Sequence, residues 1–208
     1  MEFRNLQVES RIIEMAKEYE TFINSIKIQE WSTILCSSNS ADVHSLLKYK
    51  NPESIENGMS GIILFLLELY NCTNDKNRLR NIEQLAEEVI NYCKNHSTNN
   101  YSFYTGRCGV IYSLIQLYSV NQNRKLIDEC LQLIIPCNSD FLNSKYTSDY
   151  LYNGRSGVLL ILTELYVISK EPFLLQYIEQ FIDKILSNAI LTEKGISWKN
   201  EEEINLKN

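Results

Sequence analysis

The sequence predicts an all-α fold built from helical hairpin repeats, each with one inner and one outer helix. Six of the seven glycines form Gly-x-x-Gly pairs whose first members lie 48 residues apart both times. Each pair precedes an apolar stretch that ends in Leu-Tyr, and a polar turn and an amphipathic segment follow. A fixed period of this kind is typical of units that stack to bury their apolar faces. The pairs are Gly58/Gly61, Gly106/Gly109 and Gly154/Gly157.

The first 50 residues precede the repeats, and we expect them to form one long helix and a loop. One helical face carries the apolar residues Ile12, Met15, Ala16, Tyr19, Phe22, Ile23 and Ile26, which predicts an outer helix before the first inner one. The segment from Cys36 to Asn57 is rich in Ser and Asn, and reads as loop with one short helix around Val43 to Tyr49. No segment of convincing length alternates with the period of a strand.

Each glycine pair then opens an inner helix of roughly 13–15 residues that is apolar on nearly all sides and therefore buried. We expect these helices to begin near Met59, Arg107 and Arg155. The first glycine can take a positive φ or admit a close backbone approach, and the second lets a neighbour pack closely. The alternative is functional, because N–H groups at converging helix N-termini can bind anions or polar substrate groups.

An amphipathic outer helix follows each inner helix after a polar turn. In the first repeat the apolar spacing is i, i+3, i+4, i+7, i+8, i+11, which is the pattern of a one-sided helix. The apolar residues of the third repeat are also spaced along one helical face. The apolar positions are Ile82, Leu85, Ala86, Val89, Ile90 and Cys93 in the first repeat, and Leu174, Ile178, Phe181, Ile182, Ile185 and Ala189 in the third.

Charge and composition exclude several classes of protein. The net charge is -6, which argues against a nucleic-acid partner, because phosphate binding relies on clustered Lys and Arg. No apolar run reaches the ~18 residues of a membrane-spanning helix. The charged N-terminus "MEFRNLQVESRIIEM" has no apolar core of a secretory signal. We therefore expect a cytoplasmic protein.

The six cysteines predict neither a disulfide scaffold nor a metal site. The chain is too rich in core residues for a disulfide framework, has no export signal and contains no Cys-x-x-Cys pair. Cys93, Cys108 and Cys130 fall among apolar helical positions, where cysteine acts as a small buried hydrophobe.

The repeats resemble the lanthionine synthetase C-like family from about Asn51 to the C-terminus. The phrases "IENGMSGIILFLLELY", "FYTGRCGVIYSLIQLY" and "YLYNGRSGVLLILTELY" carry the resemblance. It implies an α/α toroid, in which inner helices with glycine-rich N-terminal loops lie inside an outer ring. It also implies a peptide substrate. The family's bacterial cyclases use zinc to activate a peptide Cys thiol, which adds to a dehydroamino acid and closes a thioether ring.

The chain departs from the family where the chemistry lies. The resemblance implies a Cys and a Cys-His pair as zinc ligands and a Gly-x-x-His-Gly segment with the catalytic His, and the chain has none of these. His44 and His96 lie in polar stretches, where we expect surface residues. The family's catalytic Asp lies four residues before a first glycine; that position is Tyr150, so Asp149 is the nearest candidate for a catalytic residue. We expect no zinc to bind this chain.

The C-terminal phrase Gly195 to Trp198 is similar to one that precedes the family's catalytic repeat. The chain therefore reads as the first half of a toroid, with residues 1–50 before three repeats in residues 51–208. One interpretation is the N-terminal part of a thioether cyclase, not catalytic by itself. A second is a non-catalytic half-toroid that pairs with itself or with another chain as a module for peptide binding or scaffolding. A third is a carbohydrate-active toroid, which needs a carboxylate pair at a cleft; Glu53 and Asp149 lie near glycine loops, but nothing in the sequence marks them as such a pair. We expect the chain to associate with itself or with the missing C-terminal half.

Overall fold

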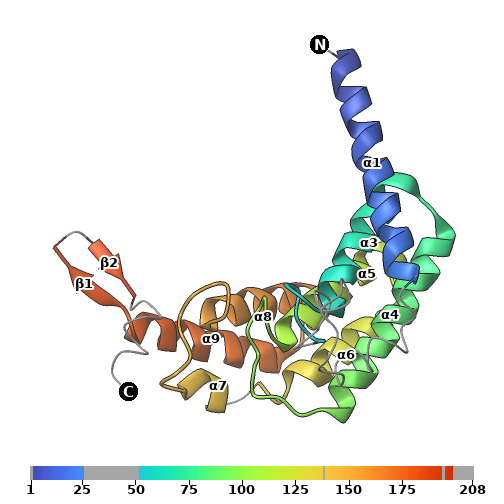
Figure 1. Ribbon diagram of the computed structural model, residues 1–208. Coiled ribbons are helices and arrows are strands. Elements are labelled where there is room, and N and C mark those ends of the chain that lie inside the picture. Colours follow the sequence, from blue (N-terminus) through green and yellow to red (C-terminus); the bar gives the residue numbers. More distant parts are fainter. Residues whose placement is uncertain (1, 26–51, 138, 194, 199–208) are drawn as a thin grey trace, which may run out of the picture.

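A computed structural model of the chain describes residues 2–25, 52–137, 139–193 and 195–198. Within these ranges the chain forms eight helices and one two-stranded sheet, so the all-α prediction is confirmed. The helical hairpins lie side by side in a curved body, part of an α/α toroid, with α1 rising beyond one end and the sheet beyond the other (Figure 1). Cys36, His44 and the short helix predicted around 43–49 lie outside the described residues.

The three inner helices are α3 (Met59–Thr73), α5 (Arg107–Asn121) and α8 (Arg155–Ser169), and each begins directly after the first glycine of its pair. Their predicted starts are therefore confirmed. α5 lies between α3 and α8 and contacts both. This central placement buries most of α5, whereas α3 and α8 bury fewer of their residues.

The outer helices are α4 (Lys76–Asn95), α6 (Arg124–Ile134) and α9 (Pro172–Ser187), each packed against the inner helix that precedes it. Only two residues join the helices of each hairpin, so the chain reverses at once. The second of the two is the N-cap. The side chains of Asp75 and Asn123 accept hydrogen bonds from backbone N–H groups two residues later, and in the third repeat Pro172 opens the helix instead.

The first residue of each two-residue connection has a left-handed backbone. It is Asn74, Gln122 or Lys170, with φ of 52°, 54° and 61°, and its N–H donates to the carbonyl of a tyrosine four residues earlier. The three residues are 48 positions apart, so the turn recurs as faithfully as the glycines do. A single left-handed residue is a common way to end a helix.

The amphipathic pattern predicts burial well in the first repeat and less well in the third. All six apolar positions predicted for α4 are buried. In α9 only Leu174 and Phe181 are fully buried, Ile182 is 39% exposed, and Ala189 lies beyond the helix. The difference arises because α4 and α6 pack against the hairpin that follows them. Among the described residues, α9 has no such neighbour.

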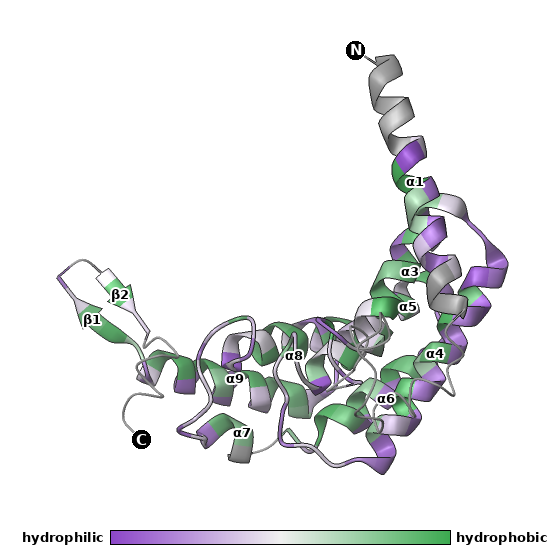
Figure 2. Cartoon of the chain, in the orientation of Figure 1, coloured by the Kyte–Doolittle hydropathy of each residue, from purple (hydrophilic) through white to green (hydrophobic). Residues whose placement is uncertain are grey.

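The N-terminal helix α1 (Glu2–Ser25) is present as predicted and packs against α3. It is held by Arg78 of α4, whose Nε and Nη2 donate to the two carboxylate oxygens of Glu20 at 2.6 Å and 2.5 Å. Its apolar face, however, is not buried where the structure describes it. Ile12, Met15 and Tyr19 are 59%, 54% and 65% exposed, because much of α1 extends past the hairpins (Figure 2).

The remaining elements are the short helix α7 (Ser139–Asn143) and a hairpin of β1 (Ile190–Thr192) and β2 (Gly195–Ser197). The strands pair antiparallel, with Leu191 opposite Ile196. The sequence shows no segment of convincing length with the period of a strand, and strands of three residues are too short to show one. No helix in the described part of the chain has the length and apolarity to span a bilayer.

Candidate functional site

The glycine loops that precede the inner helices are the candidate site, and the same backbone bond closes all three. The N–H of the first helical residue donates to the carbonyl seven residues earlier. The pairs are Met59 to Pro52 at 2.9 Å, and Arg107 to Asn100 and Arg155 to Ser148 at 3.0 Å. These N–H groups are thus satisfied within the loop, which weakens the interpretation of the helix N-termini as anion sites.

The glycines are required by close backbone contacts. A Cβ on Gly61 would lie 2.0 Å from the carbonyl oxygen of Ile55, and one on Gly157 would lie 2.3 Å from that of Leu151. Gly109 meets the carbonyl of Phe103 in the same way, at 2.8 Å. These distances leave no room for a side chain and favour the packing interpretation.

The first glycines are the helix N-caps, and their backbone is extended. Gly58, Gly106 and Gly154 have φ of -129°, -137° and -122°, so the option of a positive φ was wrong. A Cβ on Gly106 would lie 2.5 Å from the carbonyl oxygen of Asn100, and one on Gly154 would lie 2.4 Å from that of Ser148. Glycine is needed here for the close approach of the loop.

Backbone hydrogen bonds join the three loops to one another. The N–H of Ile55 donates to the carbonyl of Tyr104 at 2.8 Å, and the N–H of Tyr104 donates to the carbonyl of Tyr152 at 3.0 Å. Ser54 Oγ adds a bond to the Tyr104 carbonyl at 3.1 Å. The inner helices therefore begin at the same end of the molecule.

Two tyrosines and a glutamate at equivalent positions of the three loops form a partly exposed surface, which we call the loop face: Glu56, Tyr104 and Tyr152. The tyrosine rings stack, with centroids 4.9 Å apart and planes at 13°. The Tyr152 hydroxyl donates to Glu56 Oε2. The loop face thus presents an aromatic platform beside a carboxylate.

The unpaired charges of the glycine loops and the inner helices are acidic. Across the three loops and the inner helices, Arg107 and Arg155 are the only cationic side chains, and both are buried in ion pairs. The remaining carboxylates are Glu56, Glu68 and Glu164. Burial raises the pKa of Glu164. The pKa of Tyr112 on α5 is raised mainly by burial, and the negative charges of Glu164 and Glu68 raise it further. Such a surface favours cationic or neutral groups over anionic ones.

The first buried ion pair joins the first loop to the second inner helix. Arg107 donates from Nη2 to Glu53 Oε1 at 2.8 Å and from Nε to Oε2 at 3.1 Å, and Nη2 also reaches the carbonyl of His96 at 2.8 Å. The two side chains are 6% and 5% exposed. This two-pronged geometry suits the planar guanidinium. It fixes two neighbouring repeats relative to each other.

The second ion pair holds Asp149, the candidate catalytic residue. Asp149 Oδ1 accepts from Arg155 at 3.0 Å, and Oδ2 accepts from the amide of Asn188 at 2.9 Å. Arg155 also donates to the backbone carbonyls of Leu142, Ser144, Thr147 and Ser148. Both oxygens of Asp149 are thus engaged in holding the loop, and its catalytic role stays a prediction.

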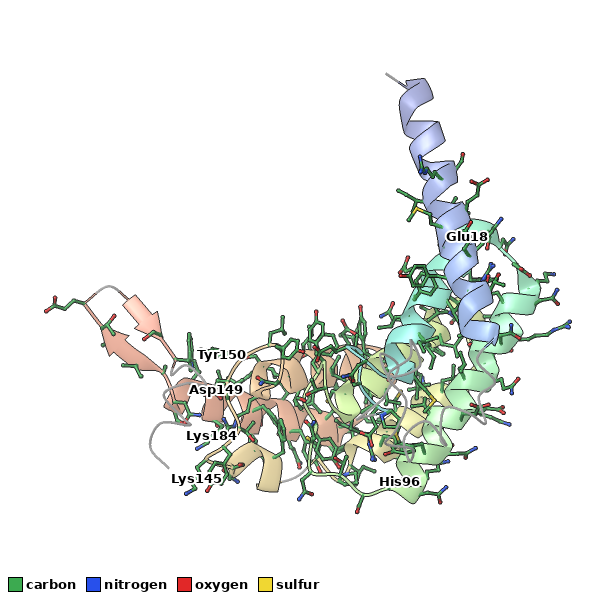
Figure 3. All side chains as sticks on the ribbon, viewed as in Figure 1. Glu18, His96, Lys145, Asp149, Tyr150 and Lys184 are labelled. Carbon is green, nitrogen blue, oxygen red and sulfur yellow. The ribbon has the colours of Figure 1, made fainter. Side chains whose placement is uncertain are left out.

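His96 lies away from Asp149. It is exposed at the end of α4, stacks on Tyr92 with centroids 4.1 Å apart, and lies across the molecule from Asp149 (Figure 3). A surface histidine was the expectation, and the two residues do not form a catalytic pair. The glycosidase interpretation needs a pair of available carboxylates, but Glu53 and Asp149 are each bound to a different arginine.

Four of the five cysteines that the structure describes are buried, including the three predicted to act as buried hydrophobes. Cys93, Cys108, Cys130 and Cys137 are buried and Cys72 is exposed. Burial raises the pKa of Cys93 and Cys137 to about 12, and raises the pKa of Cys108 and Cys130 well above the usual value. A thiol must lose its proton to bind metal. Nowhere in the described ranges do three His, Cys, Asp or Glu side chains group as metal ligands, so these residues do not fit the zinc site of the family.

Residues 195–198 form β2 and the tryptophan that follows it. Gly195 has φ of 128°, which favours glycine, and Trp198 Nε1 donates to the carbonyl of Ile185 at 2.8 Å. The phrase thus ties the β-hairpin to the end of α9.

Sequence reasoning missed the two arginines and the stacked tyrosines, although the repeat carried a signal for them. Arg107 and Arg155 occupy the same repeat position, directly after the first glycine. Glu53 and Asp149 share another, five residues before it. The repeat register could have suggested that these arginines bind these carboxylates. It could not have shown that Arg107 binds the carboxylate of the preceding repeat whereas Arg155 binds the one in its own repeat.

A comparison with known families places the chain in a described family. Residues 49–208, more than half of the chain, match the family described as lanthionine synthetase C-like protein. The matched span includes all three glycine loops and all three hairpins. A search of curated proteins found no match to the chain.

Proposed function

The chain belongs to the lanthionine synthetase C-like family, and from this premise we propose that it forms the peptide-binding part of a thioether-cyclase toroid. In this proposal the loop face holds a segment of the substrate peptide. The bond-forming chemistry is not carried by the described residues. The family relationship to lanthionine cyclases supports the peptide as substrate class.

The observation that carries the proposal is the joining of the three glycine loops into one surface. The loops are bonded to one another through Tyr104, and the stacked pair Tyr104–Tyr152 offers flat apolar rings with hydroxyl edges. Aromatic platforms of this kind bind peptide side chains through packing and, where the side chain is cationic, through cation–π contacts. Glu56, which accepts a hydrogen bond from the Tyr152 hydroxyl, adds attraction for Lys and Arg.

Two features support a binding role without catalysis. The described thiols are buried or isolated and form no zinc ligand set. The candidate base Asp149 is bound by Arg155 and Asn188 through both oxygens, so it would have to give up those bonds to take a proton. The proposed role therefore ends at holding the peptide.

The test is peptide binding measured by fluorescence anisotropy. A labelled Cys-containing peptide with dehydrated residues and net positive charge should bind saturably, and Tyr104→Ala should weaken binding at least about tenfold. Tyr146→Ala is the matched control, since Tyr146 is an exposed tyrosine outside the glycine loops. Circular dichroism would check that both variants fold. Equal loss in both variants, or no binding by the parent chain, would contradict the proposal.

The second candidate function is a non-catalytic scaffold that associates with another helical surface. It is favoured by the apolar residues that α9 leaves exposed. It predicts that the chain binds no dehydrated peptide and still forms a defined complex.

A further inference from the structure

We infer that the loop face selects a cationic side chain, so that the peptide it holds carries a lysine or an arginine at this point. The inference rests on the proposed function and deepens it, since it names the kind of residue that the loop face recognises. In this arrangement the apolar stem of the lysine or arginine packs on the rings of Tyr104 and Tyr152. Its charged end forms an ion pair with Glu56.

The first observation is a carboxylate that is held in place and has no cation beside it. Glu56 lies in the first glycine loop and Tyr152 in the third, 96 positions later, and the Tyr152 hydroxyl donates to Glu56 Oε2 at 2.5 Å. This bond orders an exposed side chain before any ligand arrives, which lowers the entropic cost of binding. None of the ion pairs among the described residues includes Glu56. Its negative charge is therefore positioned and available to a cation of the peptide.

The second observation is that buried aromatic residues support the tyrosine stack. The ring of Phe103 packs edge-on against Tyr104, with centroids 4.9 Å apart and planes at 69°, and against Tyr112 of α5 at 5.2 Å. Gly157 makes room for Phe103, because a Cβ on Gly157 would lie 2.7 Å from the Cβ of Phe103. Phe103 is buried, whereas Tyr152 at the other side of the stack is 42% exposed. The stack is thus fixed to the core and still open to a ligand.

The rings and the carboxylate together match lysine and arginine. Both of these side chains have an apolar stem and a cationic end, and a cation is also attracted to the face of a tyrosine ring. A neutral apolar side chain would gain the ring contact without the ion pair. An acidic side chain would be repelled by Glu56. The two cationic side chains of the glycine loops and inner helices, Arg107 and Arg155, could not bind it instead, because both are buried in ion pairs.

The test compares the affinities of two labelled peptides for the full chain by fluorescence anisotropy. One peptide contains a cysteine, dehydrated residues and a single lysine, and the other has norleucine in place of the lysine. Norleucine keeps the apolar stem and removes the charge. The chain should bind the lysine peptide about fivefold more tightly or better. Glu56→Gln should weaken binding of the lysine peptide about three- to fivefold and change binding of the norleucine peptide less than about twofold.

Glu87→Gln is the matched control, because it removes the same charge from an exposed position on the outer helix α4. It should leave the binding of both peptides unchanged. Tyr152→Phe keeps the ring and removes the hydrogen bond to Glu56, so it should weaken the binding of the lysine peptide alone. Combined with Glu56→Gln it should add no further loss, because the hydroxyl acts through the carboxylate. Circular dichroism would check that every variant folds.

Equal affinity of the parent chain for the two peptides would overturn the inference and leave peptide binding itself intact. Binding of neither peptide would contradict the proposed function as well. If Glu56→Gln weakened the binding of both peptides equally, Glu56 would have a structural role and the inference would fail. Equal effects of Glu87→Gln and Glu56→Gln would mean attraction by overall charge and would also overturn it.

Discussion

At the scale of single residues, the protein depends on two buried arginines that follow the first glycines. Arg107 binds Glu53 of the preceding loop, and Arg155 binds Asp149 of its own. Buried charges are costly unless each is paired and hydrogen-bonded, and here both guanidinium groups have several partners. Their role in the structure is to hold loops that have no regular secondary structure.

We predict that Glu53→Ala lowers the free energy of unfolding by about 3–5 kcal/mol, because it leaves the Arg107 charge buried without its partner. The double variant Glu53→Leu with Arg107→Met should recover most of the loss, since no unpaired charge remains. Urea unfolding followed by circular dichroism measures both. If Glu53→Ala cost less than about 1 kcal/mol, the pair would not hold the loops.

At the scale of the elements, each hairpin combines an apolar inner helix, a two-residue turn and a capped outer helix. The left-handed turn residue is asparagine in the first repeat, glutamine in the second and lysine in the third. Asparagine tolerates this backbone better than most residues, whereas lysine has no local way to offset the steric cost. The turn geometry is therefore imposed by the packing of the two helices.

We predict that Lys170→Gly raises the free energy of unfolding by about 0.5–1 kcal/mol. Glycine removes the contact between Cβ and carbonyl that costs roughly 1–2 kcal/mol, and its greater freedom in the unfolded chain takes back part of the gain. The neighbouring change Ser169→Gly is the control and should destabilise, because Ser169 is the last residue of α8. Thermal unfolding of the two variants measures the difference, and destabilisation by Lys170→Gly would contradict the reasoning.

At the scale of the whole molecule, the three hairpins form a curved body with unlike ends. Two large apolar residues of the inner helix α8, Leu160 and Val167, are exposed, whereas none is exposed on α3, against which α1 packs. Further apolar surface lies on α1, α9 and the β-hairpin, where Leu191 is 83% exposed.

We predict that the purified chain holds well below one equivalent of zinc. The four buried thiols have raised pKa values, so their thiolate forms are scarce near neutral pH, and zinc needs three protein ligands held together. Elemental analysis after dialysis against a weak chelator measures the content. One tightly held zinc per chain would show that a ligand set forms and would contradict the prediction.

The sequence by itself determined the hairpins and the start of each inner helix. The glycine pairs, the apolar runs and the cap residues recur every 48 residues, and each acts on backbone within a few residues of itself. Local signals of this kind can be interpreted without knowledge of the fold. This is why the helix starts were predicted correctly near Met59, Arg107 and Arg155.

Only the tertiary structure decided which residues meet across the loops and which apolar faces are covered. Glu53 and Arg107 are 54 positions apart. No local pattern shows that Glu53 forms an ion pair with Arg107 and not a carboxylate pair with Asp149. α9 carries apolar residues on one face as α4 and α6 do, yet several of them are exposed, because burial depends on the presence of a neighbouring hairpin. α1 also carries its apolar residues on one face, and that face stays exposed where the structure describes it. Periodicity shows which face of a helix can be buried, while packing decides whether anything covers it.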